Sequence, residues 1–463
     1  MLADRKDIPI SDFINAISTA IDLGAPVLNH HHQKVAYIAW RIAQEMGLEK
    51  NAIQDIILAA KVHDIGAFSS REFVILQEFE AFGEDVDAHA LLGYKLLKSF
   101  KPLSRVAKLI EHHHEYYDRT KPSIPLGSYI IHLADRIAIL FDPDREILGQ
   151  SFEIIGKVYR CRDMFHPIAF HAFERLAERE YFWVEANTPT LSAPEVEKAE
   201  ANCEIVDLGL IRAFAKLMAQ LIDFRSRFTA THSSGVAAVA SEIARIAGFS
   251  EYDIELMEIA GFVHDLGKLV VPNAVLEKVG ALNSDEFNSI KKHTYYTYLI
   301  LSSIRGMEEV AKLAAYHHER LNGEGYPFHI KGEDFTTLSQ IMAVADVLTA
   351  LSEDRPYRGG LNREKTLEIL FDMADNDGVD ISLVEMVGDE FSRIDAARVK
   401  AQHTALIEYQ SFYDLEGSGG RARRKELESE PAAARISVLP PQGNKPAARK
   451  SWFYERHRVF QRA

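Results

Sequence analysis

One pattern of histidines and aspartates occurs twice along the chain in the same order. VAKLIEHHHE (106–115) matches VAKLAAYHHE (310–319) at seven of ten positions, and VHDIG (62–66) matches VHDLG (263–267). Aligned on these segments, the two copies are offset by 201 residues at first, then by 204, and by 211 at the last aspartate. Chance matches of single histidines would not keep this order and near-constant spacing, so we predict two tandem copies of one domain.

Both copies are predicted to be helical. Apolar residues recur at helical spacing in each copy, at Val35, Ile38, Ala39 and Ile42 and at Val236, Val239, Ala240, Ile243 and Ile246. Alternation typical of strands is scarce, so the expected fold is all-α. Shifts in composition predict an N-terminal domain over 1–190, a linker over 191–203, a second domain over 204–415, and a disordered basic tail over 416–463.

Composition narrows the function. A chain of 463 residues that is 47% hydrophobic is too long for one core and too apolar for general disorder. The formal charge is -15, and since the tail from Gly417 carries +7, the remaining body carries -22. Such a body is a poor nucleic-acid binder, so we expect no DNA partner. No segment resembles a membrane span or a secretory signal, and two cysteines, Cys161 and Cys203, fit a reducing cytoplasm.

Each copy supplies six metal-competent positions, one of them followed directly by an aspartate. The second copy offers His232, His264, Asp265, His293, His317, His318 and Asp346, and the first offers His31, His63, Asp64, His89, His113, His114 and Asp135. Five histidines and two aspartates exceed the needs of one ion, whereas two divalent ions bridged by the aspartate of the His-Asp pair use them all.

Two divalent ions roughly 3.5–4 Å apart suit in-line displacement at phosphorus, so the set predicts phosphoester hydrolysis. A single His-Asp dipeptide or a single buried histidine would indicate nothing, but the repetition of the whole set favours metal binding. In the first copy, the runs His30–His32 and His112–His114 leave the choice of ligand open by one position.

The second copy resembles the HD-GYP subgroup of the HD-domain phosphohydrolase superfamily. The matching segments are VHDLGK (263–268), HHERLNGEGYP (317–327) and ADVLTALSEDRPYR (345–358). This resemblance implies a bacterial signalling enzyme that linearises a cyclic dinucleotide, chiefly cyclic di-GMP and in some members cyclic GMP–AMP. It also implies two or three metal ions, often iron or manganese.

The resemblance assigns roles residue by residue. One ion would be held by His232, His264, Asp265 and Asp346, and the other by Asp265, His293, His317 and His318. Lys268 would contact the scissile phosphate and act in catalysis together with Asp265. The substrate would be contacted by Gly325, Tyr326 and Pro327 of the GYP loop and by Arg355 and Arg358. Phe228 stands where trinuclear members have Glu, which favours two ions, and Gln340 replaces a frequent Arg, which leaves substrate preference open.

The first copy resembles the wider superfamily only, since Ala67 replaces the lysine and the GYP loop is absent. Three interpretations fit it: a second phosphohydrolase, for example of the terminal phosphate of the linear product; a regulatory domain that binds metal or ligand; or a relic kept for packing. We favour a metal-binding domain, regulatory or catalytic, which would hold two further ions.

The predicted function is metal-dependent hydrolysis of a cyclic dinucleotide, cyclic di-GMP first, to the linear 5′-phosphorylated dinucleotide. Three alternatives stay open. The substrate could be 3′,3′-cyclic GMP–AMP; the chain could be a non-catalytic receptor that meets signalling proteins through its GYP face; or the first copy could be the principal hydrolase, acting on nucleotide monophosphates. Oligomeric state is not predicted.

Overall fold

The computed structural model describes residues 8–24, 30–67, 84–120, 123–188, 205–225, 231–276, 278, 280–354 and 359–414. The N-terminal half contains β1 (Ile8–Pro9), α1 (Ile10–Gly24), α2 (His31–Glu45), α3 (Lys50–Lys61), α5 (Glu84–Lys98), η3 (Lys101–Leu103), α6 (Ser104–Glu111), α7 (Leu126–Ala138), α8 (Ile147–Arg160), η4 (Arg162–Met164), α9 (Pro167–Ala177) and α10 (Glu180–Asn187).

The C-terminal half contains β2 (Ile205–Val206), α12 (Leu208–Arg225), α13 (His232–Ile246), α14 (Glu251–Val263), η5 (Leu266–Val270), α15 (Asn273–Leu276), α16 (Ser284–Ser302), α17 (Glu308–Ala315), η6 (Tyr316–His318), η7 (Gly332–Asp334), α18 (Thr337–Ser352), α19 (Arg363–Asp375), α20 (Ile381–Asp389) and α21 (Phe391–Asp414). The predicted all-α fold is confirmed, since the strands are two residues long.

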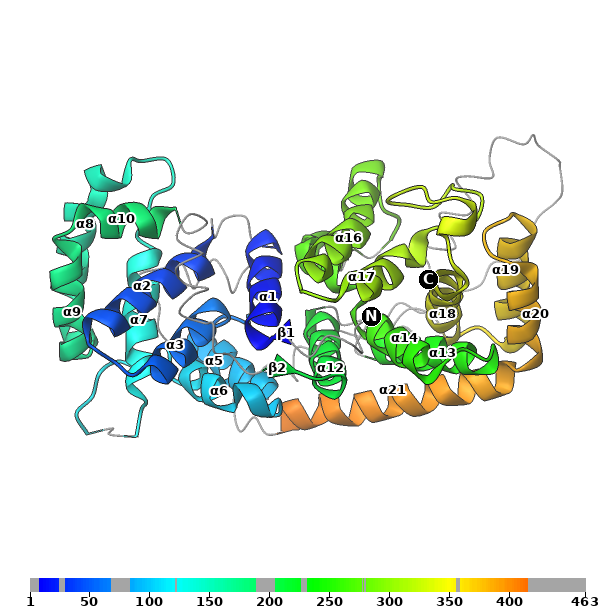
Figure 1. The fold of residues 1–463 in the computed structure, drawn as a ribbon, viewed down its shortest axis with the longest axis horizontal. Helices are drawn as coiled ribbons and strands as arrows, with labels where there is room; N and C mark the ends of the chain where they lie inside the picture. Colours follow the sequence, from blue (N-terminus) through cyan, green and yellow to red (C-terminus); the bar gives the residue numbers. More distant parts are fainter. Residues whose placement is uncertain are drawn as a thin grey trace, which may run out of the picture.

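The predicted repeat is visible as a repeated order of helices. The series α1, α2, α3, α5, α6, α7 corresponds to α12, α13, α14, α16, α17, α18, each series carrying its histidines and aspartates at matching places. Helices α8 to α10 lie at the outer end of the N-terminal half, and α19 and α20 at the outer end of the other half (Figure 1). Helix α21 runs along one edge beneath α12 to α14.

The helical periodicity places the cores as predicted. Val35, Ile38 and Ile42 of α2 are fully buried, as are Val239 and Ile243 of α13. In each half the apolar faces of several helices meet in one core, and burial of these faces is the main force that holds the histidine-bearing helices together.

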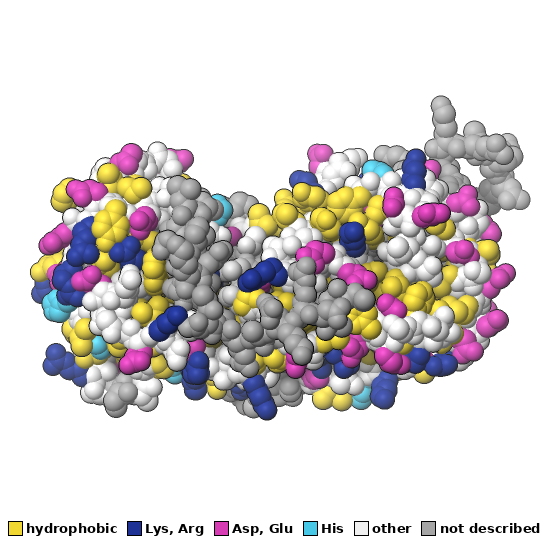
Figure 2. All heavy atoms as spheres, viewed as in Figure 1, with side chains coloured by type: hydrophobic (Ala, Val, Ile, Leu, Met, Phe, Trp, Pro, Cys, Tyr) yellow, Lys and Arg dark blue, Asp and Glu magenta, His cyan; other side chains and the backbone are white. Residues whose placement is uncertain are grey.

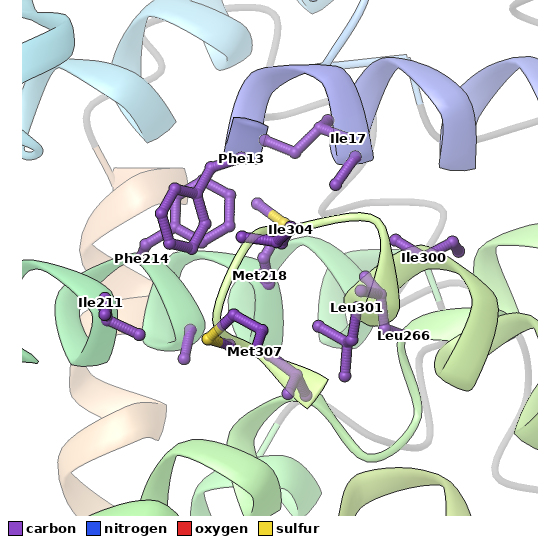
Figure 3. Close-up of a pocket in the computed structure, with 13 residues that line it drawn as sticks. Phe13, Ile17, Ile211, Phe214, Met218, Leu266, Ile300, Leu301, Ile304 and Met307 are labelled. Carbon is purple, nitrogen blue, oxygen red and sulfur yellow. The ribbon is translucent and has the colours of Figure 1, made fainter. Parts of the chain in front are cut away.

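Apart from the core of each half, an apolar contact region, the seam, joins the two halves. Strand β1 pairs antiparallel with β2, and the rings of Phe13 in α1 and Phe214 in α12 lie 4.4 Å apart. These two positions are related by the 201-residue offset, so equivalent residues of α1 and α12 meet. Figure 3 shows Phe13 and Ile17 facing Phe214, Met218 and residues of the η5 and α16 region across a small apolar cavity. Helix α1 therefore packs against the C-terminal half.

The visible face of the molecule mixes acidic and basic side chains, and the outline is hollowed between the two halves (Figure 2). Within the described ranges, no helix is both long and apolar enough to cross a membrane. The predicted linker 191–203 and the predicted tail 416–463 lie outside the described residues, and the domain boundaries stay predictions.

Candidate functional site

The His-Asp pair of each half lies where one helix ends against another. Helix α14 begins with a capping box between Ser250 and Asp253 and ends directly before His264. A Cβ atom on Gly267 would lie 1.9 Å from the carbonyl oxygen of His293, so only glycine lets this segment approach α16 so closely. Gly66 has the same role in the N-terminal half, where a Cβ atom would lie 2.1 Å from the oxygen of His89.

Backbone carbonyls fix the rings of three histidines in the C-terminal half. The Nδ1 atom of His264 lies 2.9 Å from Gly261 O, and those of His293 and His317 lie 2.7 Å from the carbonyl oxygen three residues earlier. A hydrogen bond from Nδ1 leaves the lone pair on Nε2, and all three Nε2 atoms face the carboxylate of Asp265. This is the usual arrangement of a histidine that ligates metal through Nε2.

The C-terminal half gathers all seven predicted ligands around Asp265. His264 Nε2 lies 3.3 Å from Asp265 Oδ2, and His293 Nε2 lies 3.3 Å from Oδ1. On one side, the ligand atoms of His232, His264 and Asp346 lie within 4.8 Å of one another, and on the other side so do those of His293, His317 and His318. Asp265 therefore separates two donor sets, as the bridging carboxylate of two ions would.

The N-terminal half repeats this arrangement around Asp64. His63 Nε2 lies 3.2 Å from Asp64 Oδ2, and His89 Nε2 lies 3.2 Å from Oδ1. The donors fall again into two sets, one with His31, His63 and Asp135, the other with Asp64, His89, His113 and His114. In the run His30–His32, His31 takes the position of His232, because its Nε2 lies 3.1 Å from Asp135, just as His232 Nε2 lies 3.2 Å from Asp346.

The charges of the C-terminal centre suit divalent cations. Burial alone would raise the pKa of Asp265, but His264 and Lys268 beside it hold that pKa well below its usual value. Burial lowers the pKa of His318 to about 3 and that of His317 well below normal, so both rings are neutral and keep a lone pair for a metal. The centre thus combines anionic oxygens with neutral nitrogens at His317 and His318.

Two observations indicate that the centres need additional positive charge. Burial opposes a charge on His232, yet Glu353 and Asp346 around it raise its pKa to about 10, so a proton there offsets part of the negative charge. The Nε2 atoms of His264 and His63 are buried without a hydrogen-bond partner, although each points at carboxylates. Leaving such an atom unsatisfied is costly, and a metal ion would satisfy it. The residues of both centres fit iron, manganese or zinc.

Lys268 and the GYP loop flank the C-terminal centre. Lys268 Nζ donates to Asp265 Oδ2, and its side chain is 25% exposed, so it stands between the centre and solvent. A Cβ atom on Gly325 would lie 2.4 Å from Glu319 Cα, which explains the glycine. The Tyr326 ring lies 4.9 Å from the His318 ring, and Pro327 follows it. Arg355, Arg358 and Phe228 lie outside the described residues.

Two glutamates near this centre or its loop, Glu353 and Glu319, were not identified from the sequence. Glu353 lies 3.2 Å from His232 Nδ1 and orients that ring as the carbonyls orient the others. Glu319 is fully buried and accepts hydrogen bonds from the backbone of Phe328 and Ile330, which holds the GYP loop. Gln340 is buried between Phe335 O and Asp380 N, so it supports the fold behind the loop.

The chain matches two models of known families, both described as HD domain, over residues 29–140 and 216–383. It is 30% identical over 372 residues to the 3′3′-cGAMP-specific phosphodiesterase 1 of Vibrio cholerae, covering 76% of this chain and 85% of that protein. The chain belongs to the HD-domain phosphohydrolase superfamily.

Two further proteins are similar to this chain. A cyclic di-GMP phosphodiesterase response regulator of Xanthomonas campestris is 36% identical over 156 residues, which are 33% of this chain and 41% of the regulator. A solved structure titled as a cyclic GMP-AMP-specific phosphodiesterase of V. cholerae matches with a TM-score of 0.59 at 22% identity, over 84% of this chain and 98% of that one. This last likeness shows a shared fold.

Proposed function

We propose that the C-terminal half hydrolyses a phosphodiester bond of a cyclic dinucleotide and releases the linear 5′-phosphorylated dinucleotide. The observation that carries the proposal is the division of the seven ligand candidates into two donor sets on either side of Asp265. Ions held by these sets would activate water and neutralise charge on the phosphate oxygens. The names of relatives of this chain support the same reaction.

The chain's own residues have separate tasks in this proposal. His232, His264 and Asp346 would hold one ion and His293, His317 and His318 the other, with Asp265 shared. Lys268 would leave Asp265 and donate to a non-bridging phosphate oxygen, because its exposed stem can follow a ligand and its charge stabilises the negative charge that develops there. The Tyr326 ring beside His318 would bound the substrate on the side of the GYP loop.

The choice between substrates rests on different observations. The sequence motifs favour cyclic di-GMP, whereas the relative that matches both halves of this chain is named for 3′3′-cGAMP. We therefore propose both as substrates to be compared and expect one of them to be preferred. For the N-terminal half we propose a second metal-binding centre, since its donors divide around Asp64 in the same way.

The experiment is direct. Purified full-length protein loaded with manganese or iron(II) is incubated with each dinucleotide, and products are separated by chromatography. We expect linear dinucleotide from at least one substrate, and none from a matched His264→Ala, Asp265→Ala protein. Binding of a dinucleotide without turnover under both metals would contradict the proposal and favour a receptor.

A further inference from the structure

His32 is a buried imidazole in the N-terminal half that has no counterpart in the C-terminal half. It is 0% exposed, and its Nδ1 donates to Asp22 Oδ1 of helix α1 over 2.6 Å. The 201-residue offset that relates the metal-binding sets also relates Asp22 to Asp223 and His32 to Ser233. Ser233 donates to Asp223 over 3.0 Å, so the two halves share the buried aspartate and differ in the group that it holds.

The other nitrogen of His32 faces the N-terminal centre. Its Nε2 lies 3.6 Å from Asp64 Oδ2, is buried, and has no hydrogen-bond partner. The donor atoms of His32, His63 and Asp64 lie within 4.8 Å of one another. In the C-terminal half, the equivalent carboxylate oxygen is bound by Lys268, and the N-terminal half has Ala67 in place of that lysine.

The partner of Nδ1 determines what Nε2 can do. A carboxylate that accepts a hydrogen bond from Nδ1–H fixes the tautomer with its lone pair on Nε2 and makes that nitrogen a stronger ligand. His63 and His113 are oriented in the same sense by backbone carbonyls, at 2.9 Å and 2.7 Å from their Nδ1 atoms. His32 thus has the orientation and burial of the ligand candidates around it, with a more strongly polarising partner.

We propose that His32 is an additional metal ligand of the N-terminal centre, binding together with His63 and Asp64. The inference rests on the proposed metal centre of this half. Where the C-terminal half has the Lys268 ammonium beside Asp265, the N-terminal half has the imidazole nitrogen of His32 beside Asp64. The N-terminal centre therefore has more imidazole donors than its C-terminal counterpart. Imidazole-rich sites suit zinc, copper, iron and nickel, which gives the two centres different metal preferences.

The test uses the full-length chain with His264→Ala and Asp265→Ala, so that the N-terminal centre dominates metal binding. The metal-free protein is titrated with cobalt(II), and the visible absorption bands give affinity and ligand field. Adding His32→Ser, which installs the residue of the other half, should weaken cobalt binding by about 10–100-fold and shift the bands, as expected for a lost nitrogen ligand. The exposed His171→Ser serves as the matched control and should change neither.

A second variant distinguishes the loss of a metal ligand from misfolding. Asp22→Asn keeps the ring in place but removes the carboxylate that fixes its tautomer, and should weaken cobalt binding by about 10-fold. Circular dichroism and thermal unfolding of the metal-free proteins check the fold. If His32→Ser and Asp22→Asn lower thermal stability while cobalt affinity and spectrum stay unchanged, His32 is a packing residue and the inference is wrong. If the parent protein itself binds no cobalt, the proposed N-terminal centre is wrong as well.

Discussion

The two halves share five histidines and two aspartates as ligand candidates, and they differ in the cations beside this shared set. In the C-terminal half the cation is Lys268, a quarter exposed and paired with Asp265. In the N-terminal half it is Arg136, whose side chain is 2% exposed and donates to Asp135 Oδ2 over 2.6 Å. Val347 occupies the position of Arg136 in the other half.

This difference separates the ligand scaffold from the proposed substrate apparatus. The glycine at the end of the His-Asp segment and the carbonyls that hold Nδ1 recur in both halves, so they belong to the ligand scaffold. The lysine and the GYP loop occur only in the C-terminal half. A lysine near the surface can reach a phosphate oxygen, whereas a buried guanidinium bound to Asp135 is held in place.

The largest expected effect separates the halves by activity. His264→Ala with Asp265→Ala should abolish hydrolysis of a cyclic dinucleotide, by at least about 10³-fold, because both donor sets lose a member. The matched pair His63→Ala with Asp64→Ala should retain this hydrolysis, since the C-terminal centre stays intact. Product formation is measured by chromatography, with circular dichroism as the check on folding. Equal loss in both double variants would remove the distinction between the halves.

The second prediction concerns Lys268, the cation of the C-terminal half. Lys268→Ala should lower kcat by about 10²–10³-fold, the usual cost of losing one group that stabilises charge in the transition state. Its metal content should stay near that of the unsubstituted protein, because Lys268 is not among the donors. Elemental analysis and initial rates are measured on the same preparation.

Arg136→Met provides the contrast for Lys268. Arg136 belongs to the other half, so this change should leave hydrolysis of the cyclic dinucleotide intact. If Lys268→Ala loses metal and rate in equal measure, the lysine holds the centre together and does not contact the phosphate.

The third prediction tests the seam between the halves. Phe13→Ala and Phe214→Ala should each destabilise the protein by roughly 3–5 kcal/mol, as for other buried phenylalanines, because they meet at equivalent positions. Urea unfolding followed by circular dichroism measures both, and Phe152→Ala, at 86% exposure, is the control that should change little. A large cost for Phe214 alone would mean that α1 contributes little to the C-terminal half.

Much of the fold could be predicted because the repeat supplied two independent views of one pattern. Periodicity located α2 and α13, and the shared order of histidines predicted which side chains converge, since a coincidence would not occur twice in register. The structure brings all fourteen predicted ligand positions together in two groups of seven. Their roles as metal ligands stay predictions.

The remaining features depend on contacts between segments far apart in sequence. His31 and His32 are adjacent in sequence, yet His31 contacts Asp135 of α7 and His32 contacts Asp22 of α1. Glu353 meets His232 across 121 residues, and nothing in its local sequence indicates this contact. The packing of α1 on the opposite half was missed because an amphipathic helix does not specify its partner. The sequence did offer one signal for the contact between Asp22 and His32, because Asp22 and Asp223 are related by the same 201-residue offset as the ligand candidates.

The smallest expected effect concerns the GYP loop, which only the C-terminal half has. Gly325→Ala would place a Cβ atom 2.4 Å from Glu319 Cα and 2.6 Å from Arg320 N, where the backbone must move. Because Tyr326 follows directly and its ring lies beside His318, we expect kcat/KM to fall about 10-fold, or about 1.4 kcal/mol, with metal content unchanged.

The control for the loop is Gly156→Ala in α8 of the other half. There the nearest atom to a new Cβ is Arg160 Nη1 at 3.8 Å, and alanine favours a helix, so activity should stay the same and stability should rise slightly. If Gly325→Ala left kcat/KM unchanged, the loop would not position substrate, and Lys268 would then be the one difference between the halves that matters for turnover. If it removed metal, the loop would belong to the ligand scaffold, and the separation of scaffold from substrate apparatus would fail at this point.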